Sequence, residues 1–282
     1  MKRILVPIDF SPYAGNAIDF SVKMAKVLAA EIVLLNVYEH PGSTYTDYVG
    51  LNKEFKAAMM TERLQKLNQL KKNIEETERI TVSVVQYEGS VKENIIKSSE
   101  QSKAYIIVMG TLGNGGIKER LWGSSTAAVI GASKIPVVTI PLEYDGHLPD
   151  KILFTTNHFE GSPGILDTLF ELAAINMAQV FVLLFITENA EYTVGIKDRL
   201  KKLVEYGQKL QNSYHDQSLV TEYLSGNEFE KTIEQYISNN DIKLLAMISY
   251  KRSFFERLVY PSMTKKMSYH IKIPLLVIPA EK

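Results

Sequence analysis

The sequence predicts an α/β protein built from two tandem open α/β sandwich domains, each a five-stranded, mainly parallel sheet with helices on both faces. Three observations support this prediction. The chain has 282 residues, which is enough for two domains of ordinary size. Short β-branched runs alternate with longer helical segments, as they do in βαβ units. The second half of the chain also repeats the order of segments found in the first half.

The first half alternates strands with helices from its first residues onward. The apolar run Ile4-Leu5-Val6 predicts the first strand. Leu64, Leu67 and Leu70 lie three residues apart, with only polar residues between them, and predict a long second helix. The run Ile106-Ile107-Val108-Met109 is typical of a parallel strand that is covered on both faces. The expected strands are residues 4–8, 31–37, 81–86, 105–109 and 137–140, and the expected helices are residues 13–30, 52–77, 91–101 and 124–133.

The second half follows the same plan, with strands expected at residues 152–155, 180–186, 218–224, 243–248 and 275–278. Both halves open on a basic residue followed by an apolar strand, and both close on a Lys-Ile-Pro segment followed by another. The opening segments are residues 2–10 and 151–158, and the closing segments are residues 134–141 and 272–279. Gly146 and Pro149 break the chain between the halves, so we expect domains at residues 1–145 and 150–282.

The composition excludes several classes of protein. With 45% hydrophobic and 23% charged residues, the chain is neither disordered nor fibrous. Its 32 basic residues balance 32 acidic ones, so no net charge attracts nucleic acid or an anionic membrane. There is no cysteine for a disulfide, a thiolate metal site or a nucleophile. No secretory segment follows Met1 and no run approaches 18 apolar residues, so we expect a cytoplasmic protein.

One segment, residues 109–126 (MGTLGNGGIKERLWGSST), departs from ordinary packing. It leaves the fourth strand, contains four glycines within seven residues, and enters a helix. Glycine permits positive φ and close approach of a ligand to the backbone. We expect Ser124 or Ser125 to cap the helix, whose first turn offers free N–H groups and a positive dipole end. The segment therefore predicts a phosphate cradle at the carboxyl end of a parallel strand.

Better-known patterns for phosphate binding and catalysis are absent from the sequence. There is no G-x-x-x-x-G-K-[ST], and no G-x-G-x-x-G follows the first strand. The five histidines are scattered and form no pair with metal-ligand spacing, and no Ser/His/Asp arrangement is readable. We therefore assign no catalytic residue and no protein-held metal.

The spacing Gly110-x2-Gly113-x9-Gly123-Ser124 resembles the G-x2-G-x9-G-[ST] nucleotide motif of the universal stress protein family. Residues 4–11, 34–37 and 135–138 resemble the first, second and last strands of that family. The resemblance covers the whole chain as a tandem member, with two family domains in one polypeptide.

The resemblance implies a site for ATP, AMP or ADP in the first half, and an Mg²⁺ ion held mainly by the phosphates is compatible with it. Asp9 would accept a hydrogen bond from the adenine amino group, and Pro7 and Val37 would enclose the base. Met109 and Gly110 would line the adenosine, and Gly113 would let the loop pass close to the ribose and phosphate. The implied contacts to the phosphates come from Gly123, Ser124 and Ser125, together with Thr126. Two alternatives stay open: Asp9 caps the first helix alongside Ser11, and the glycines form an ordinary surface loop.

In the second half the corresponding stretch, residues 247–262, contains no glycine. Ile248 stands in the place of Gly110, Asn157 in that of Asp9, and Thr155 in that of Pro7. Tyr260-Pro261 replaces Gly123-Ser124, and proline has no N–H to offer a phosphate. We expect this degenerate half to bind no nucleotide in the same manner. Because family domains pair through their last strands, the resemblance makes it an internal dimerisation partner.

Three functions fit the sequence. The preferred one is a stress-response regulator that responds to an adenine nucleotide through an unknown protein partner, as a single chain or a homodimer. The second is a slow ATPase or phosphotransferase that uses the same pocket. The third is an interaction module that binds no nucleotide. Neither nucleic acid nor a membrane is an expected partner.

Overall fold

The computed structural model describes residues 1–39, 51–111, 123–162, 164–187, 193–215, 217–249 and 272–280. The elements of the first half are β1 (Arg3–Pro7), α1 (Pro12–Leu28), β2 (Glu31–Tyr38), α2 (Leu51–Glu78), β3 (Val82–Glu88), α3 (Val91–Gln101), β4 (Ile106–Gly110), α4 (Ser124–Ala132) and β5 (Val137–Ile140). Those of the second half are β6 (Lys151–Thr155), α5 (Asp167–Ile175), β7 (Gln179–Thr187), α6 (Thr193–Ser213), β8 (Leu219–Gly226), α7 (Phe229–Asn240), β9 (Leu244–Ser249) and β10 (Leu275–Pro279).

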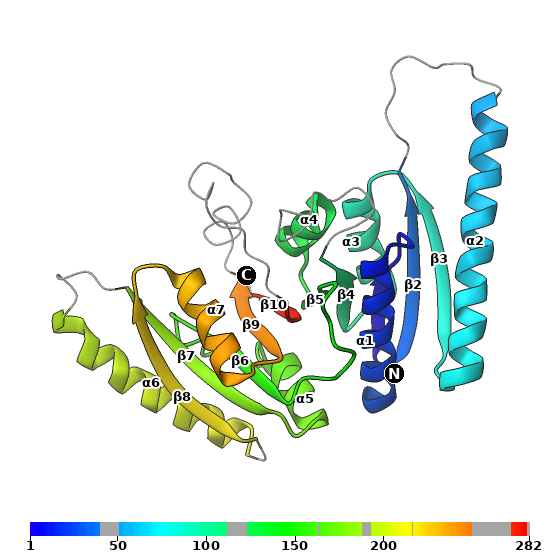
Figure 1. The fold of residues 1–282 in the computed structure, drawn as a ribbon. Coiled ribbons are helices and arrows are strands. Elements are labelled where there is room, and N and C mark those ends of the chain that lie inside the picture. The colour runs from blue at the N-terminus through cyan, green and yellow to red at the C-terminus, as the bar shows by residue number, and fades with distance from the viewer. Residues whose placement is uncertain are drawn as a thin grey trace.

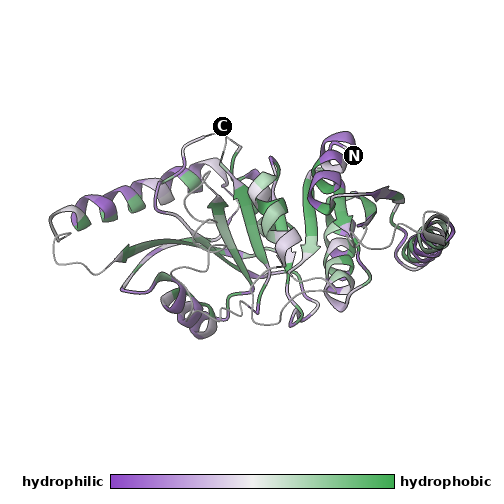
Figure 2. Cartoon of the chain, turned by 90° about the horizontal axis from the view of Figure 1, so that it is seen from above, coloured by the Kyte–Doolittle hydropathy of each residue, from purple (hydrophilic) through white to green (hydrophobic). Residues whose placement is uncertain are grey.

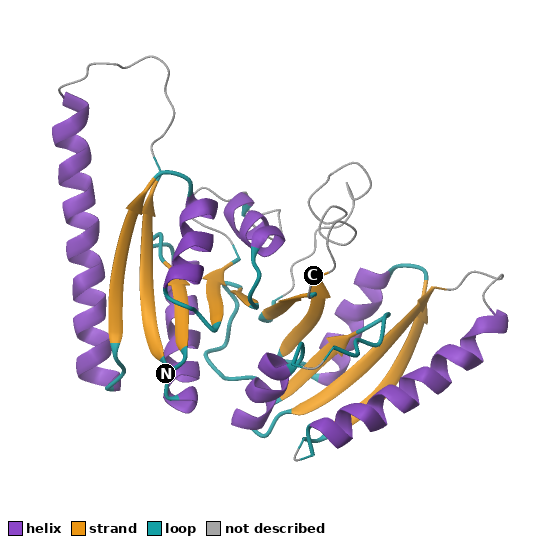
Figure 3. Cartoon of the chain, turned by 180° about the vertical axis from the view of Figure 1, so that it is seen from behind, coloured by secondary structure: helices purple, strands orange, loops and turns teal. Residues whose placement is uncertain are grey.

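The strands of the described residues form one sheet in the order β3-β2-β1-β4-β5-β10-β9-β6-β7-β8. Neighbouring strands within each half are parallel, whereas β5 and β10 run antiparallel, with Val138 opposite Leu276. Figures 1 and 3 show the two halves meeting at these strands in the middle of the molecule. The predicted fold class is confirmed, and so is the pairing of the last strands, which leaves neither of them as an exposed edge.

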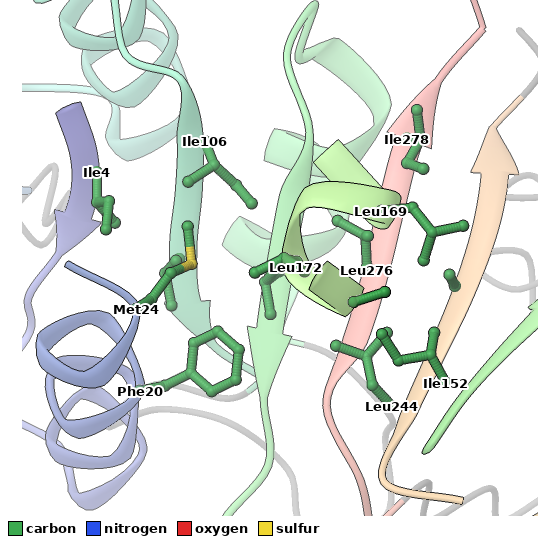
Figure 4. Packing of buried hydrophobic residues seen from close by; sticks show 14 of the residues in the cluster. Ile4, Phe20, Met24, Ile106, Ile152, Leu169, Leu172, Leu244, Leu276 and Ile278 are labelled. Carbon is green, nitrogen blue, oxygen red and sulfur yellow. The ribbon is translucent and has the colours of Figure 1, made fainter. Parts of the chain in front are cut away.

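Helices cover both faces of the sheet because successive strand side chains point to opposite sides. One buried cluster joins α1, α2, α5 and α6 to one face, and a second joins α3, α4 and α7 to the other. Figure 2 shows predominantly hydrophobic strands flanked by helices that contain both hydrophilic and hydrophobic residues. Figure 4 follows the first cluster across the middle of the sheet, from Phe20 on α1 to Leu276 on β10. Within the described residues, no helix combines the length and the apolar character needed to cross a membrane.

The segment that connects the halves packs against α1 through residues 141–144. Asn16 Nδ2 donates to the carbonyl oxygens of Pro141 (2.9 Å) and Leu142 (3.0 Å). The ring of Tyr144 packs edge-on against Phe20, with 5.7 Å between ring centroids. Helix α1 therefore contacts both the core of the first half and the segment that leads into the second.

A polar cluster also bridges the halves. Glu171 on α5 accepts hydrogen bonds from Lys2 Nζ and from the hydroxyl of Tyr105, the latter at 2.5 Å. The Lys2 ammonium lies 4.3 Å from the centroid of the Tyr105 ring. These contacts, together with the β5–β10 pairing, fix one half against the other.

Candidate nucleotide site

The candidate site lies at the carboxyl ends of the two central strands of the first half. In the order β3-β2-β1-β4-β5, the chain leaves β1 toward β2 on one side and leaves β4 toward β5 on the other. Such a reversal of strand order is the switch point at which open α/β sheets bind ligands. Asp9 follows β1 and Thr111 follows β4, so both lie at this point.

The turn between β1 and α1 holds Asp9 in a defined position. Its Oδ1 accepts a hydrogen bond from the backbone N–H of Ser11 at 3.0 Å, and Phe10 has a φ of 62°. Ser11 is the N-cap of α1, and its side chain accepts from Ala14 N at 3.2 Å. Ser11 is therefore the N-cap of α1, and the hydrogen bond from Ser11 N to Asp9 lies in the turn before the helix.

Pro7 and Val37, expected around the base, and Met109, expected along the adenosine, share one face of the sheet. Met109 is buried in the cluster under α3 and α4, and the half-buried Val37 packs against the same cluster. Pro7 pairs with Leu35, and Leu5 and Leu35 belong to that cluster, so strand alternation directs Pro7 to the same side. The structure thus brings together residues from β1, β2 and β4 that the sequence separates widely.

Gly110 has a packing role that the sequence did not reveal. A Cβ atom at this position would lie 2.6 Å from Cβ of Tyr13 and 3.0 Å from its carbonyl carbon. Only glycine lets the first turn of α1 approach the end of β4 this closely. The resemblance assigned Gly110 to the lining of the adenosine, but the contact with α1 is sufficient by itself to require glycine.

Two hydrogen bonds hold the start of α4 against the end of β4. Gly123 N donates to Thr111 O at 2.7 Å, which closes the base of the loop between them. The hydroxyl of Thr126, a buried residue of α4, donates to Gly110 O at 3.0 Å. The helix N-terminus is therefore fixed at the switch point, and the Thr126 hydroxyl proton is used within the protein.

The expected cap of α4 is wrong. Gly123 is the N-cap, with extended backbone (φ −63°, ψ 157°), and Ser124 is already helical. Glycine has no side chain to bond the first N–H groups, whereas Ser11 caps α1 and the Ser90 side chain accepts from Glu93 N at the start of α3. Among the described residues, no side chain caps the first turn of α4, which lies beside the hydroxyl groups of the exposed Ser124 and half-buried Ser125.

Some of the predicted site lies beyond what the structure describes. Gly113 belongs to residues 112–122, which are outside the described residues. Among the residues that are described, no group of three His, Asp or Glu side chains is arranged to hold a metal ion.

Asn36 was not predicted from the sequence as a residue of the site. Its side-chain Nδ2 donates to Ile8 O at 2.7 Å. The available signal was a single amide within the apolar run Leu34-Leu35-Asn36-Val37.

A model of the Universal stress protein family matches residues 1–141 and, a second time, residues 149–279. The chain belongs to the universal stress protein family. A universal stress protein of Methanocaldococcus jannaschii is 31% identical over 153 residues, which cover 49% of this chain and 94% of the relative. Another, from Synechocystis sp., is 28% identical over 142 residues, which cover 50% of this chain and 85% of the relative.

The solved structure of a universal stress protein from Archaeoglobus fulgidus covers 98% of this chain and 98% of its own, with a TM-score of 0.73 and 17% identity. The two proteins therefore share their fold over both halves, as expected for a tandem universal stress protein.

In the second half of this universal stress protein, different side chains stand at the equivalent positions. Strand registers place Thr155 opposite Leu183, as Pro7 is opposite Leu35, so Phe185 takes the place of Val37. The Phe185 ring packs edge-on against Phe229, with 5.1 Å between centroids. Large aromatic side chains thus occupy the face that Val37 lines in the first half.

Asn157, which stands in the place of Asp9, uses its side-chain amide to bond backbone carbonyl oxygens. With its amide oriented by its hydrogen-bond partners, Asn157 donates to Phe185 O (3.2 Å) and Thr156 O (3.1 Å). Ile248 occupies the Gly110 position and is buried. The described residues 157–162, which follow β6 where the start of α1 follows β1, are not helical. Residues 250–271, which include Tyr260-Pro261, lie outside the described residues.

Proposed function

We propose that the first half binds an adenine nucleotide (ATP, ADP or AMP) and that the protein is a nucleotide-dependent regulator in the stress response. One observation carries the proposal. The start of α4, whose N-cap is a glycine without a side chain, is held at the end of β4, beside the switch point where Asp9 follows β1.

The chemistry of this point suits a nucleotide. Free N–H groups and the positive dipole end of α4 favour the phosphates, with the hydroxyls of Ser124 and Ser125 nearby. Pro7 and Val37 offer an apolar surface to the base, Met109 lies beside them on the same face, and the Asp9 carboxylate accepts a hydrogen bond from the adenine amino group. Thr126 acts by holding Gly110, and an accompanying Mg²⁺ ion is held mainly by the phosphates.

In this proposal the second half binds no nucleotide and serves as a permanent partner. Asn157 has a neutral amide whose N–H groups are taken by Thr156 O and Phe185 O. The Phe185–Phe229 pair fills the face where the first half would receive the base. Nucleotide binding in the first half would then change a surface to which another protein binds. The β5–β10 pairing would keep the second half attached to the first throughout.

Calorimetric titration of the full chain with ATP, ADP and AMP tests the proposal, and we expect one site per chain. Asp9→Ala should weaken binding by about tenfold or more, because a hydrogen bond to a charged group contributes about 1.5–3 kcal/mol. Gly123→Val should also weaken it, by covering the start of α4. The backbone of Gly123 is extended, a conformation open to any residue, so this change requires no positive φ of valine.

Asn157→Ala is the matched control and should leave the affinity unchanged. Absence of heat with every nucleotide, two sites per chain, or an equal loss from Asn157→Ala would overturn the proposal. Measuring ADP release from Mg²⁺-ATP in the same samples separates regulation from turnover: rapid multiple turnover would favour an ATPase.

A further inference from the structure

We propose that Asn36 is a positioning residue for adenine recognition, acting through Asp9; this inference rests on the proposed function. Asn36 lies on β2 and is completely buried. Its Nδ2 donates to Ile8 O at 2.7 Å, while its Oδ1 has no hydrogen-bond partner among the described residues.

The hydrogen bond from Asn36 extends the β1–β2 pairing to the residue just before Asp9. Strand β1 ends at Pro7, yet Ile8 N donates to Leu35 O at 2.7 Å and Ile8 O accepts from Asn36. The backbone N–H and the backbone carbonyl of Ile8 are therefore both hydrogen-bonded to β2. The direction in which the chain leaves the sheet, and with it the position of Asp9, depends on this anchor.

The residue after Asp9 makes that anchor important. Phe10 adopts a left-handed backbone conformation (φ 62°), which bulky side chains rarely take. Such a conformation persists only where the surrounding structure imposes it. Asp9 is thus held between the anchored Ile8 and the left-handed Phe10, and its Oδ1 is tied to Ser11 N.

The second half shows what happens without the amide. Leu184 occupies the equivalent position on β7, and the main-chain bond persists as Thr156 N to Leu183 O at 2.9 Å. The turn then takes another course: Phe159 N donates to Thr156 Oγ1 at 3.2 Å, and Phe159 is the left-handed residue.

The left-handed residue therefore lies four positions after the end of β6 in the second half, against three positions after the end of β1 in the first. Loss of the side-chain anchor and a changed turn occur together.

Packing alone gives no reason for an amide at this site. A buried acceptor without a partner lowers stability, and Leu184 shows that an apolar side chain fits the same place in the sheet. What the amide supplies, and leucine does not, is the hydrogen bond to Ile8 O.

The test compares the affinities of the full chain for ATP and for inosine triphosphate, whose base has an oxo group where adenine has its amino group. Asn36→Leu should weaken ATP binding about tenfold while changing the affinity for inosine triphosphate less than threefold. The ratio of the two affinities should approach that of Asp9→Ala. The midpoint of thermal unfolding, followed by circular dichroism, should stay unchanged or rise. If Asn36→Leu does not fold, we expect the same change in the two nucleotide affinities from Asn36→Ala.

Ser98→Ala is the matched control, because Ser98 on α3 is also buried with a hydroxyl that has no partner in the described structure. It should change neither affinity. An unchanged ratio in Asn36→Leu, whether both affinities fall equally or neither falls, would overturn the inference while leaving the proposed function standing. A wild-type chain that binds neither nucleotide would instead overturn the proposed function.

Discussion

Replacing Gly110 with alanine tests whether this glycine is required by α1 packing, independently of any ligand. The added Cβ would lie 2.6 Å from Cβ of Tyr13, with the carbonyl carbon and oxygen of the same residue at 3.0 and 3.1 Å. Two of these three atoms belong to the backbone, so a rotamer change cannot relieve the overlap. Helix α1 would have to move by about 0.8 Å to restore an ordinary 3.4 Å contact.

Overpacking of this kind typically lowers the free energy of unfolding by about 1–3 kcal/mol. The matched control is Gly15→Ala, in the helix that Gly110 contacts. Gly15 is exposed, and a Cβ there meets nothing within 4 Å. Alanine favours the helix interior over glycine by about 0.5–1 kcal/mol, so this control should raise the stability.

Urea unfolding of both variants, without nucleotide, is the assay. Circular dichroism follows both halves together, which matters because a two-domain chain need not unfold in one step. A Gly110→Ala variant as stable as the wild type would refute the packing argument.

Two further predictions concern local contacts. Ser11→Ala removes the side chain that accepts from Ala14 N and should lower the free energy of unfolding by about 1 kcal/mol, measured by urea titration; no change would show that the cap is dispensable. Partial burial alone would raise the pKa of the Glu171 carboxyl, but hydrogen bonds from Lys2 and Tyr105 outweigh this and set its pKa below the usual 4.5. Because the folded pKa is lowered, the stabilisation from Glu171 is present above about pH 4.5 and is lost as the pH falls through the lowered value. Thermal unfolding of Glu171→Gln should accordingly depend less on pH below 4.5 than that of the wild type, and identical profiles would contradict this.

Much of the fold could be predicted because the signals are local. Continuous apolar runs such as residues 106–109 are parallel strands, and the predicted alternation of strands and helices holds in both halves. Pairing of the last strands also followed from the repeat and the family resemblance. Domain boundaries at residues 1–145 and 150–282, the cytoplasmic location and the nucleotide contacts stay predictions.

The errors occurred where two local solutions compete. A serine next to a glycine suggested a cap at Ser124 or Ser125, but the extended backbone of Gly123 makes the glycine itself the N-cap. Asp9 and Ser11 are both good capping residues by type, and the turn geometry selects Ser11. Residue type alone does not distinguish these alternatives, because the choice depends on where the helix begins.

The sequence by itself determined the repeated α/β plan, the position of the glycine-rich segment and the absence of its counterpart in the second half. Only the tertiary structure decided which side chains share a face at the switch point, that Gly110 lies against Tyr13, and that Asn36 anchors Ile8. The reason is physical: periodicity and turn chemistry act over a few neighbouring residues, whereas these contacts join strands and helices that are adjacent only after the sheet has assembled.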